Sequence, residues 1–205
     1  MKNKIIKDAL ALTLITLVAG VALGGVYEIT KDPIAKQEAQ AKAEAYEQVF
    51  TDAAAFEEVE MDDTLIQTIR DQLDQEGYKA QSIEEVMRAE DQSGETRGYA
   101  FTVVTSEGYG GDIQFSMGVQ NDGTLNGISI LSIGETAGLG MNADTPAFKD
   151  QFVGKQVEKL QYTKNGATQD DEINAISGAT VTTNAMTNGV NAGLCAFRVM
   201  EGGDQ

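Results

Sequence analysis

The residues best suited to chemistry are hydroxyl side chains in a short stretch near the carboxyl end of the chain. Ser177 and Thr180 enclose Gly178 and Ala179, and Thr182 follows two residues later. The apolar residues beyond them recur at helical spacing, which predicts a helix beginning near Thr180; they are Met186, Val190, Leu194 and Phe197. We expect Ser177 or Thr180 to cap this helix. Its open backbone N–H groups and its dipole would suit an anion such as a phosphate. An ordinary helix cap with no ligand is the alternative.

Two glycine-rich stretches lie upstream, each next to a predicted strand. The first is EGYGG at residues 107–111, and the second is GETAGLG at residues 134–140. Glycine allows the backbone to approach a flat or bulky group closely. A flexible connection between strands is the alternative interpretation of the first stretch.

The composition excludes several classes of function. The chain has a net charge of −17, no His and one Cys. Nucleic acid is not expected as a partner, because neutralising phosphates requires a basic surface. With no His and one thiol, the chain offers no zinc site, no iron–sulfur cluster and no disulfide of its own. Cys195 lies in the last predicted helix and is expected to be a packed thiol. Electron transfer by this protein would therefore require an organic cofactor.

Taken in order after an apolar amino-terminal segment, the three stretches resemble the FMN-binding proteins that include the G subunit of the Rnf complex and the C subunit of the sodium-pumping NADH:quinone reductase. NAISGATVTT, at residues 174–183, resembles their flavinylation motif. The resemblance implies that FMN is attached covalently to Thr180 through a phosphoester. It places the phosphate near the helix start, by Ser177, Gly178, Ala179 and Thr182.

The same resemblance implies flavin contacts in the two glycine-rich stretches. EGYGG is similar to the Gly-Tyr-Gly-Gly of the family, which points to Tyr109 and Gly110. GETAGLG is similar to its Glu-Thr-Pro-Gly-Leu-Gly, a loop near the isoalloxazine ring, which points to Thr136, Gly138 and Leu139.

The sequence departs from the family pattern at several positions. Asn174 stands where the family often has Asp, and Ala137 stands where it has Pro. Ile133 and Gly134 occupy the place just before the second glycine-rich motif where a His is often found.

The amino-terminal segment has the pattern of a membrane anchor. Residues 1–8 include three lysines, and residues 9–27 carry no charge and are mostly apolar, which is long enough to cross a bilayer. The lysines predict a cytoplasmic amino terminus, so the remainder would lie on the extracytoplasmic face of the cell membrane as a single-pass protein. A cleaved signal peptide is the alternative, but the apolar run exceeds a normal signal core.

The rest of the chain divides by composition. Residues 28–80 are expected to form a helical stalk and an acidic connection, with a helix starting at Asp32-Pro33, no regular structure at residues 51–61, and an amphipathic helix over residues 63–75 that Gly77 ends. Residues 81–200 are expected to form the FMN-binding domain, with residues 201–205 as a tail. Strands are predicted at residues 83–88, 98–105, 112–119, 125–133 and 157–162, and a short helix at residues 145–152. The order of the first four strands predicts an antiparallel meander and an α+β fold.

The resemblance favours the G subunit of an Rnf-type complex, which couples electron transfer between ferredoxin and NAD to movement of Na⁺ or H⁺. We expect the chain to be one subunit of this translocase with no independent turnover. Its partners would be the lipid bilayer, the other subunits, and a flavin transferase, because a threonine hydroxyl without a His is a poor nucleophile. The alternatives are the C subunit of the quinone reductase, a solitary FMN-bearing protein that transfers electrons outside the cell, and a tethered domain with no flavin.

Overall fold

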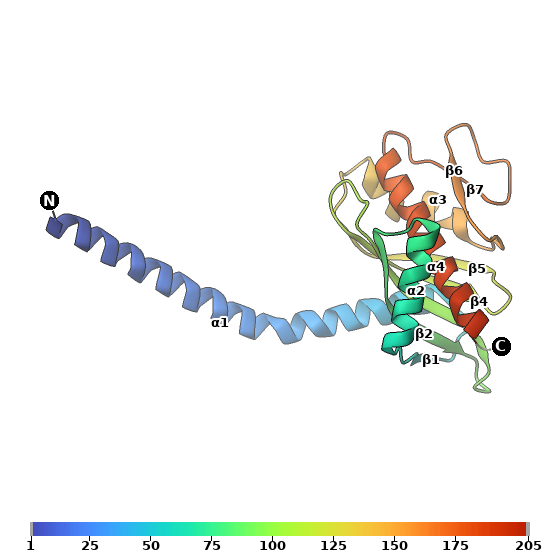
Figure 1. Ribbon diagram of the computed structural model, residues 1–205, viewed down its shortest axis with the longest axis horizontal. Coiled ribbons are helices and arrows are strands. Elements are labelled where there is room, and N and C mark those ends of the chain that lie inside the picture. The colour runs from blue at the N-terminus through green and yellow to red at the C-terminus, as the bar shows by residue number, and fades with distance from the viewer. Residues whose placement is uncertain (1, 204–205) are drawn as a thin grey trace. The chain divides into compact units, whose positions relative to one another are not determined.

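The computed structural model describes residues 2–203 in two compact units, one ending at Ala41 and one beginning at Lys42. The helices of the chain are α1 (Lys2–Val49), α2 (Asp63–Glu76), α3 (Pro146–Lys149) and α4 (Thr180–Gly203), with 3₁₀ turns at Gly140–Asp144 and Asp150–Phe152 (Figure 1). The strands are β1 (Ala55–Glu58), β2 (Gln81–Glu90), β3 (Thr96–Thr105), β4 (Ile113–Gln120), β5 (Leu125–Ile133), β6 (Gln161–Thr163) and β7 (Glu172–Asn174). The α+β expectation is confirmed.

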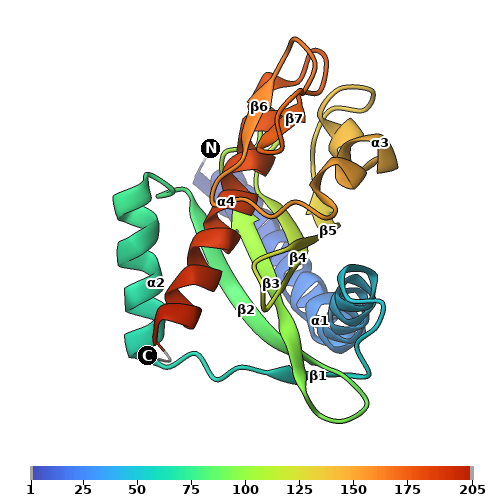
Figure 2. The same cartoon turned by 90° about the vertical axis from the view of Figure 1, so that its right-hand side faces the viewer.

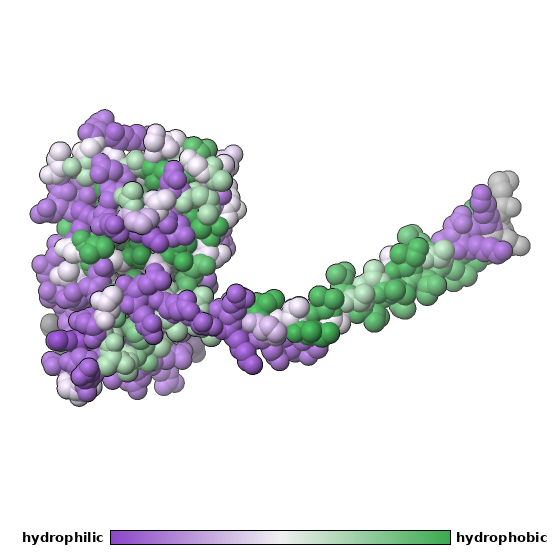
Figure 3. Space-filling view, turned by 180° about the vertical axis from the view of Figure 1, so that it is seen from behind, coloured by the Kyte–Doolittle hydropathy of each residue, from purple (hydrophilic) through white to green (hydrophobic). Residues whose placement is uncertain are grey.

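The amino-terminal helix α1 is continuous, so the prediction of a new helix at Asp32-Pro33 is wrong: Pro33 lies inside α1. A proline removes one backbone hydrogen bond within a helix. The Ala-, Glu-, Gln- and Lys-rich segment that follows has high helix propensity, which favours continuation. Within residues 2–203, α1 is the one helix long and apolar enough to cross a membrane, and Figure 3 shows hydrophobic residues along its middle part, between hydrophilic ends. This segment indicates a membrane anchor. Met1 lies outside the described residues.

The second unit is built on a five-stranded antiparallel sheet in the order β1-β2-β3-β4-β5. The central strands were correctly predicted, including the β4–β5 connection at Asn121-Asp122-Gly123, where Gly123 has φ 83°. Strand β1 was missed, since residues 51–61 were expected to lack regular structure. Three of its four residues are exposed and two are acidic, and they pair with β2 at the sheet edge, where no apolar alternation is required.

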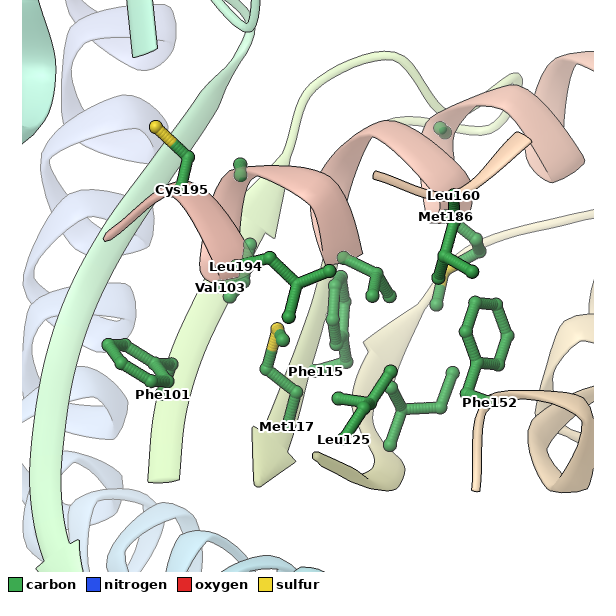
Figure 4. Close-up of a cluster of buried hydrophobic side chains, with 14 of the residues drawn as sticks. Phe101, Val103, Phe115, Met117, Leu125, Phe152, Leu160, Met186, Leu194 and Cys195 are labelled. Atoms are coloured by element: carbon green, nitrogen blue, oxygen red, sulfur yellow. The ribbon is translucent and has the colours of Figure 1, made fainter. Parts of the chain in front are cut away.

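The core lies between this sheet and the helices α2 and α4, which cover one of its faces (Figure 2). Figure 4 shows Leu194 of α4 directed toward Phe115 and Met117 of β4, and Met186 farther along the helix, near Leu160 and Phe152. All four of the apolar α4 residues that defined the predicted helix are buried. The predicted helix α2 is also confirmed: Asp62 caps its start by accepting from the Leu65 N–H at 2.7 Å, and Gly77 ends it at φ 89°.

The opposite face of the sheet is covered by the last turns of α1, which belong to the same compact unit. Tyr46, Val49 and Phe50 pack against Ala89 and Ala100. The Tyr46 hydroxyl lies 2.7 Å from the Thr102 hydroxyl, and burial raises the pKa of Tyr46. The compact unit therefore includes residues 42–80, which the sequence pattern assigned to a stalk and connection.

The segment between β5 and α4 differs most from expectation. The short helix predicted at residues 145–152 is present as α3, which the 3₁₀ turn Asp150–Phe152 continues. The predicted strand at residues 157–162 is wrong over most of its length, because β6 covers only Gln161–Thr163 and pairs in parallel with β7. Buried Leu160 and partly buried Val157 supplied the apolar pattern of this stretch without forming a longer strand. Of the predicted tail at residues 201–205, residues 201–203 belong to α4 and residues 204–205 lie outside the described residues.

Candidate functional site

A cavity of about 590 Å³ lies where the three sequence motifs meet. The β3–β4 connection supplies Tyr109, the segment after β5 supplies four residues between 135 and 140, and residues 178–182 come from the start of α4 and the turn before it. The residues lining it are Tyr109, Glu135, Thr136, Leu139, Gly140, Gly178, Ala179, Thr180, Val181 and Thr182. This volume lies within the range of small-molecule and cofactor sites.

The turn before α4 is held by Thr183 rather than by the two residues expected to cap the helix. The Thr183 hydroxyl accepts from the Ile176 N–H at 3.0 Å and donates to the Ala179 carbonyl at 2.9 Å. The prediction that Ser177 or Thr180 caps the helix is therefore wrong: within residues 2–203, neither hydroxyl makes a hydrogen bond to the protein. Thr183 is buried and lies four residues from Ala179, so its side chain reaches back along the first turn.

The Thr180 hydroxyl, at the start of α4, therefore has no hydrogen-bond partner within residues 2–203. Thr180 is partly exposed and lines the cavity, whereas Ser177 is exposed but does not line it. Within the described residues, the backbone N–H groups of Thr180, Val181 and Thr182 have no acceptor, and the first intrahelical bond comes from the Thr183 N–H to the Ala179 carbonyl at 3.0 Å. Unpaired N–H groups at a helix N-terminus favour an anion.

Glu135 joins two of the motifs. Its Oε1 atom accepts from the Tyr109 N–H at 2.7 Å and from the Gly110 N–H at 3.4 Å. The side chain is 9 % exposed and lines the cavity. A buried carboxylate requires such donors, and here they fix the β3–β4 connection against the segment after β5.

Two glycines of the motifs are required by close packing. A Cβ on Gly140 would lie 2.5 Å from Glu135 Oε2 and 2.6 Å from Thr182 Oγ1. Gly178 has φ 76°, a conformation that favours glycine, and a Cβ there would lie 3.0 Å from Leu139 Cδ2. These positions therefore leave room for the groups that face the cavity.

Glu135 is the one charged residue of the lining, which combines apolar side chains with the hydroxyl groups of three threonines. Tyr109, Val181 and Leu139 are 76 %, 49 % and 43 % exposed, an unusual exposure for large hydrophobic side chains gathered at one place. No Lys or Arg lines the cavity, whose residues all lie in the described part of the chain, and the sequence has no His. Across residues 2–203 no three His, Cys, Asp or Glu side chains are grouped as ligands for a metal ion.

Seven of the ten residues singled out in the sequence line this cavity, and three do not. Gly110 does not line the cavity, but its backbone N–H donates to the Glu135 carboxylate, which does. Gly138 shapes its turn at φ 76°, and Ser177 lies on the outside of the approach to α4. Sequence reasoning missed Glu135, Gly140 and Val181. Glu135 and Gly140 belong to the quoted GETAGLG motif, whose acidic residue was an available signal.

Cys195 lies away from the cavity, in the middle of α4. Burial raises the pKa of its thiol to about 12, and the neighbouring Glu76 carboxylate acts in the same direction. The thiol donates to Glu76 Oε1 at 3.4 Å, and Glu76 also forms an ion pair with Arg198 at 2.9 Å. The structure thus confirms a packed Cys195.

The fold and this site define an FMN-binding domain, and the matching family carries that description over residues 108–194. A second family, described as the RnfG N-terminal region, matches residues 1–49. The chain is 32 % identical to the G subunit of the Na⁺-translocating ferredoxin:NAD⁺ oxidoreductase complex of Acetobacterium woodii, over 95 % of this chain and 92 % of that protein. The chain belongs to the family of G subunits of ion-translocating oxidoreductase complexes.

Two further relatives place the chain within the wider group. It is 28 % identical to the G subunit of the proton-translocating ferredoxin:NAD⁺ oxidoreductase complex of Clostridium ljungdahlii, over 98 % of this chain and 96 % of that one. It is 41 % identical to the C subunit of the Na⁺-translocating NADH-quinone reductase of Pasteurella multocida, but over only 35 % of this chain and 31 % of that protein. The full-length similarity to the G subunits decides between the two kinds of complex.

Proposed function

We propose that this chain carries FMN through a phosphoester on the Thr180 hydroxyl and relays electrons within an Rnf-type complex. The observation that carries the proposal is the free Thr180 hydroxyl, which borders a cofactor-sized cavity beside unpaired backbone N–H groups. Such a helix start suits a phosphate diester.

The charges of the cavity explain why attachment would be covalent. No cationic side chain lines it, and Glu135 adds a negative charge. A free FMN phosphate would therefore meet only the helix N-terminus, whose dipole contributes about 0.3–1 kcal/mol at an exposed site. A covalent bond removes dissociation. Because the chain has no His to activate a threonine hydroxyl, a flavin transferase is needed to join Thr180 Oγ1 to the flavin phosphate.

The residues around Thr180 fit the remaining parts of the cofactor. The exposed apolar side chains of Tyr109, Leu139 and Val181 offer a surface for a flat ring. Thr136 and Thr182 supply hydroxyl groups, and Gly140 and Gly178 keep the cavity open. Bound FMN would supply one- and two-electron redox chemistry, for which the side chains of this chain have no equivalent. The protein's part is to hold and orient the ring and to limit its contact with water.

The setting of the domain follows from the anchor and from the relatives. We assign the three lysines of residues 1–8 to the cytoplasm, residues 9–27 to the membrane, and the FMN-binding domain, over about residues 81–200, to the extracytoplasmic face. The relatives are named for ferredoxin:NAD⁺ oxidoreductases that translocate Na⁺ or protons. We propose the same electron donor and acceptor for the complex that contains this chain, with the other subunits as electron partners.

Intact-mass spectrometry of the full chain tests the attachment. Expressed with a flavin transferase, the wild type should gain the mass of FMN minus water, and Thr180→Val should not. Thr187→Val is a matched control, because it removes one hydroxyl from the same helix, at a buried site whose hydroxyl donates to the Thr183 carbonyl. An added mass that persists in Thr180→Val would contradict attachment at Thr180. Loss of the added mass in Thr187→Val as well would show that the loss is not specific to the Thr180 hydroxyl.

Membrane vesicles test the role in the complex. Vesicles containing Thr180→Val should lose electron transfer from reduced ferredoxin to NAD⁺, while those containing Thr187→Val retain it. An affinity-tagged chain should co-purify with other membrane subunits. Purification of the flavinylated chain without any partner would favour a solitary electron carrier instead.

A further inference from the structure

Glu135 has a structural task that uses only one of its two carboxylate oxygens. Oε1 accepts both hydrogen bonds from the β3–β4 connection. Oε2 makes no hydrogen bond to the protein within residues 2–203. Because the side chain lines the cavity, a carboxylate charge lies at the wall of the proposed flavin site.

The Oε2 atom lies close to the backbone of Gly140. An added Cβ on Gly140 would approach both Oε2, at 2.5 Å, and Thr182 Oγ1, at 2.6 Å, so these two polar atoms flank the same point of the backbone. Thr182 is 1 % exposed and also lines the cavity, and its hydroxyl has no hydrogen-bond partner among the described residues. Glu135 Oε2 and Thr182 Oγ1 thus lie near the same point of the backbone, and neither atom has a hydrogen-bond partner among the described residues.

From this geometry, and resting on the proposed covalent FMN, we propose that Glu135 is a positioning residue that also sets the redox potential of the flavin. One oxygen holds the segment of Tyr109 in place. The other presents a negative charge to the ring. When the ring takes up two electrons and one proton, it gains one negative charge, and a nearby carboxylate opposes that gain. Glu135 therefore lowers the reduction potential.

A ring that fills the cavity would lie within a few ångströms of Glu135, and that separation sets the size of the expected effect. A like charge within about 4–6 Å disfavours a charged form by roughly a factor of ten or more. Glu135→Gln keeps the shape and an oxygen that can accept from the Tyr109 N–H, but removes the charge. We expect it to favour the reduced flavin about tenfold, which raises the potential by about 30 mV for a two-electron couple.

Glu107 provides a matched control on the same connection. Its Oε2 accepts from the Asn188 side chain at 2.7 Å and from the Asn184 side chain at 3.3 Å, and it does not line the cavity. Glu107→Gln changes the net charge of the protein by the same amount. Its potential should remain close to that of the wild type.

The experiment is a spectroscopic redox titration of the full chain, expressed with a flavin transferase and purified in detergent, after its intact mass has been measured. A raised potential in Glu135→Gln but not in Glu107→Gln supports the proposal. Equal potentials in Glu135→Gln and the wild type, or equal shifts in the two variants, would overturn it. An unmodified wild type would instead refute the covalent FMN, and with it the basis of the inference.

Glu135→Asp keeps the test decisive if Glu135→Gln folds without accepting flavin. This variant retains the charge on a shorter side chain. Restored modification with a potential near the wild-type value supports a carboxylate that both positions and tunes. Failure of both variants to accept flavin, with wild-type thermal stability, would show that Glu135 serves attachment and would overturn its assignment to the potential.

Discussion

Gly189 lies on the face of α4 that packs against the sheet, so Gly189→Ala tests how closely the helix that contains Thr180 is docked. A Cβ at Gly189 would lie 2.8 Å from Phe115 Cε1 and 2.9 Å from its Cζ. Phe115 is fully buried in the core, so its ring cannot move aside into solvent. The new methyl group must therefore displace either the ring or the helix.

The magnitude has two opposing contributions. Alanine is favoured over glycine within a helix by about 0.8–1 kcal/mol. Overpacking a core by a methyl group typically costs about 1–3 kcal/mol. The control is Gly202→Ala near the end of the same helix, where an added Cβ would meet nothing within 4 Å. The control gains the propensity without the clash, so its free energy of unfolding should exceed that of Gly189→Ala by about 1–3 kcal/mol.

Urea unfolding of the full chain in detergent measures this difference. Tyrosine fluorescence and circular dichroism are suitable signals, because the chain has six Tyr and no Trp. Equal stabilities of the two variants would refute the close packing of α4 on β4, and with it the placement of Thr180 that depends on this docking.

Three other predictions concern the site, the thiol and a charged turn. Gly140→Ala should destabilise the domain by about 1–3 kcal/mol, because its Cβ would collide with groups at the cavity wall, and it should lower the yield of flavinylated protein in intact-mass spectra. Cys195 should react with iodoacetamide at pH 8 on the order of a thousandfold more slowly in the folded chain than in urea, since a raised pKa leaves almost no thiolate; rapid native alkylation would contradict its burial. Backbone hydrogen bonds from residues 168 and 169 lower the pKa of Glu172 in the folded protein. The stability that the ionised carboxylate contributes is therefore present above the unfolded pKa of about 4.3 and is lost as the pH falls through the lower folded pKa. Glu172→Gln should therefore lose less thermal stability than the wild type on acidification from about pH 5 to pH 3, and parallel melting curves would count against this.

The sequence predicted those parts of the fold in which burial imposes a period. The four strands of the meander and the helices α2 and α4 have periodic apolar residues, because each of these elements directs one apolar face into the core between the sheet and the two helices. Strand β1 was missed because Phe56 is its one partly buried residue, and one residue gives no period. The continuity of α1 through Pro33 was missed because a local start signal is weaker than the helix propensity on both sides of it.

The site was predictable from its motifs and not from periodicity. Three stretches far apart in the sequence line one cavity, and only the resemblance indicated in advance that they belong together. The individual contacts were not predictable, since they depend on how the loops approach one another. Thr183 holds the turn that Ser177 or Thr180 was expected to cap, and this leaves the Thr180 hydroxyl free. The buried carboxylate of Glu135 joins two loops through backbone N–H groups, which no side-chain pattern records.

Peptide mapping of the flavinylated chain by tandem mass spectrometry tests the central claim most directly. The helix start contains three threonine hydroxyls within four residues, and the structure distinguishes them: Thr182 is buried, Thr183 is committed to two hydrogen bonds, and Thr180 is partly exposed at the cavity. The account predicts the FMN phosphoester on Thr180 alone. A phosphoester on Thr182, Thr183 or Ser177, or an unmodified peptide from protein made with an active flavin transferase, would contradict it.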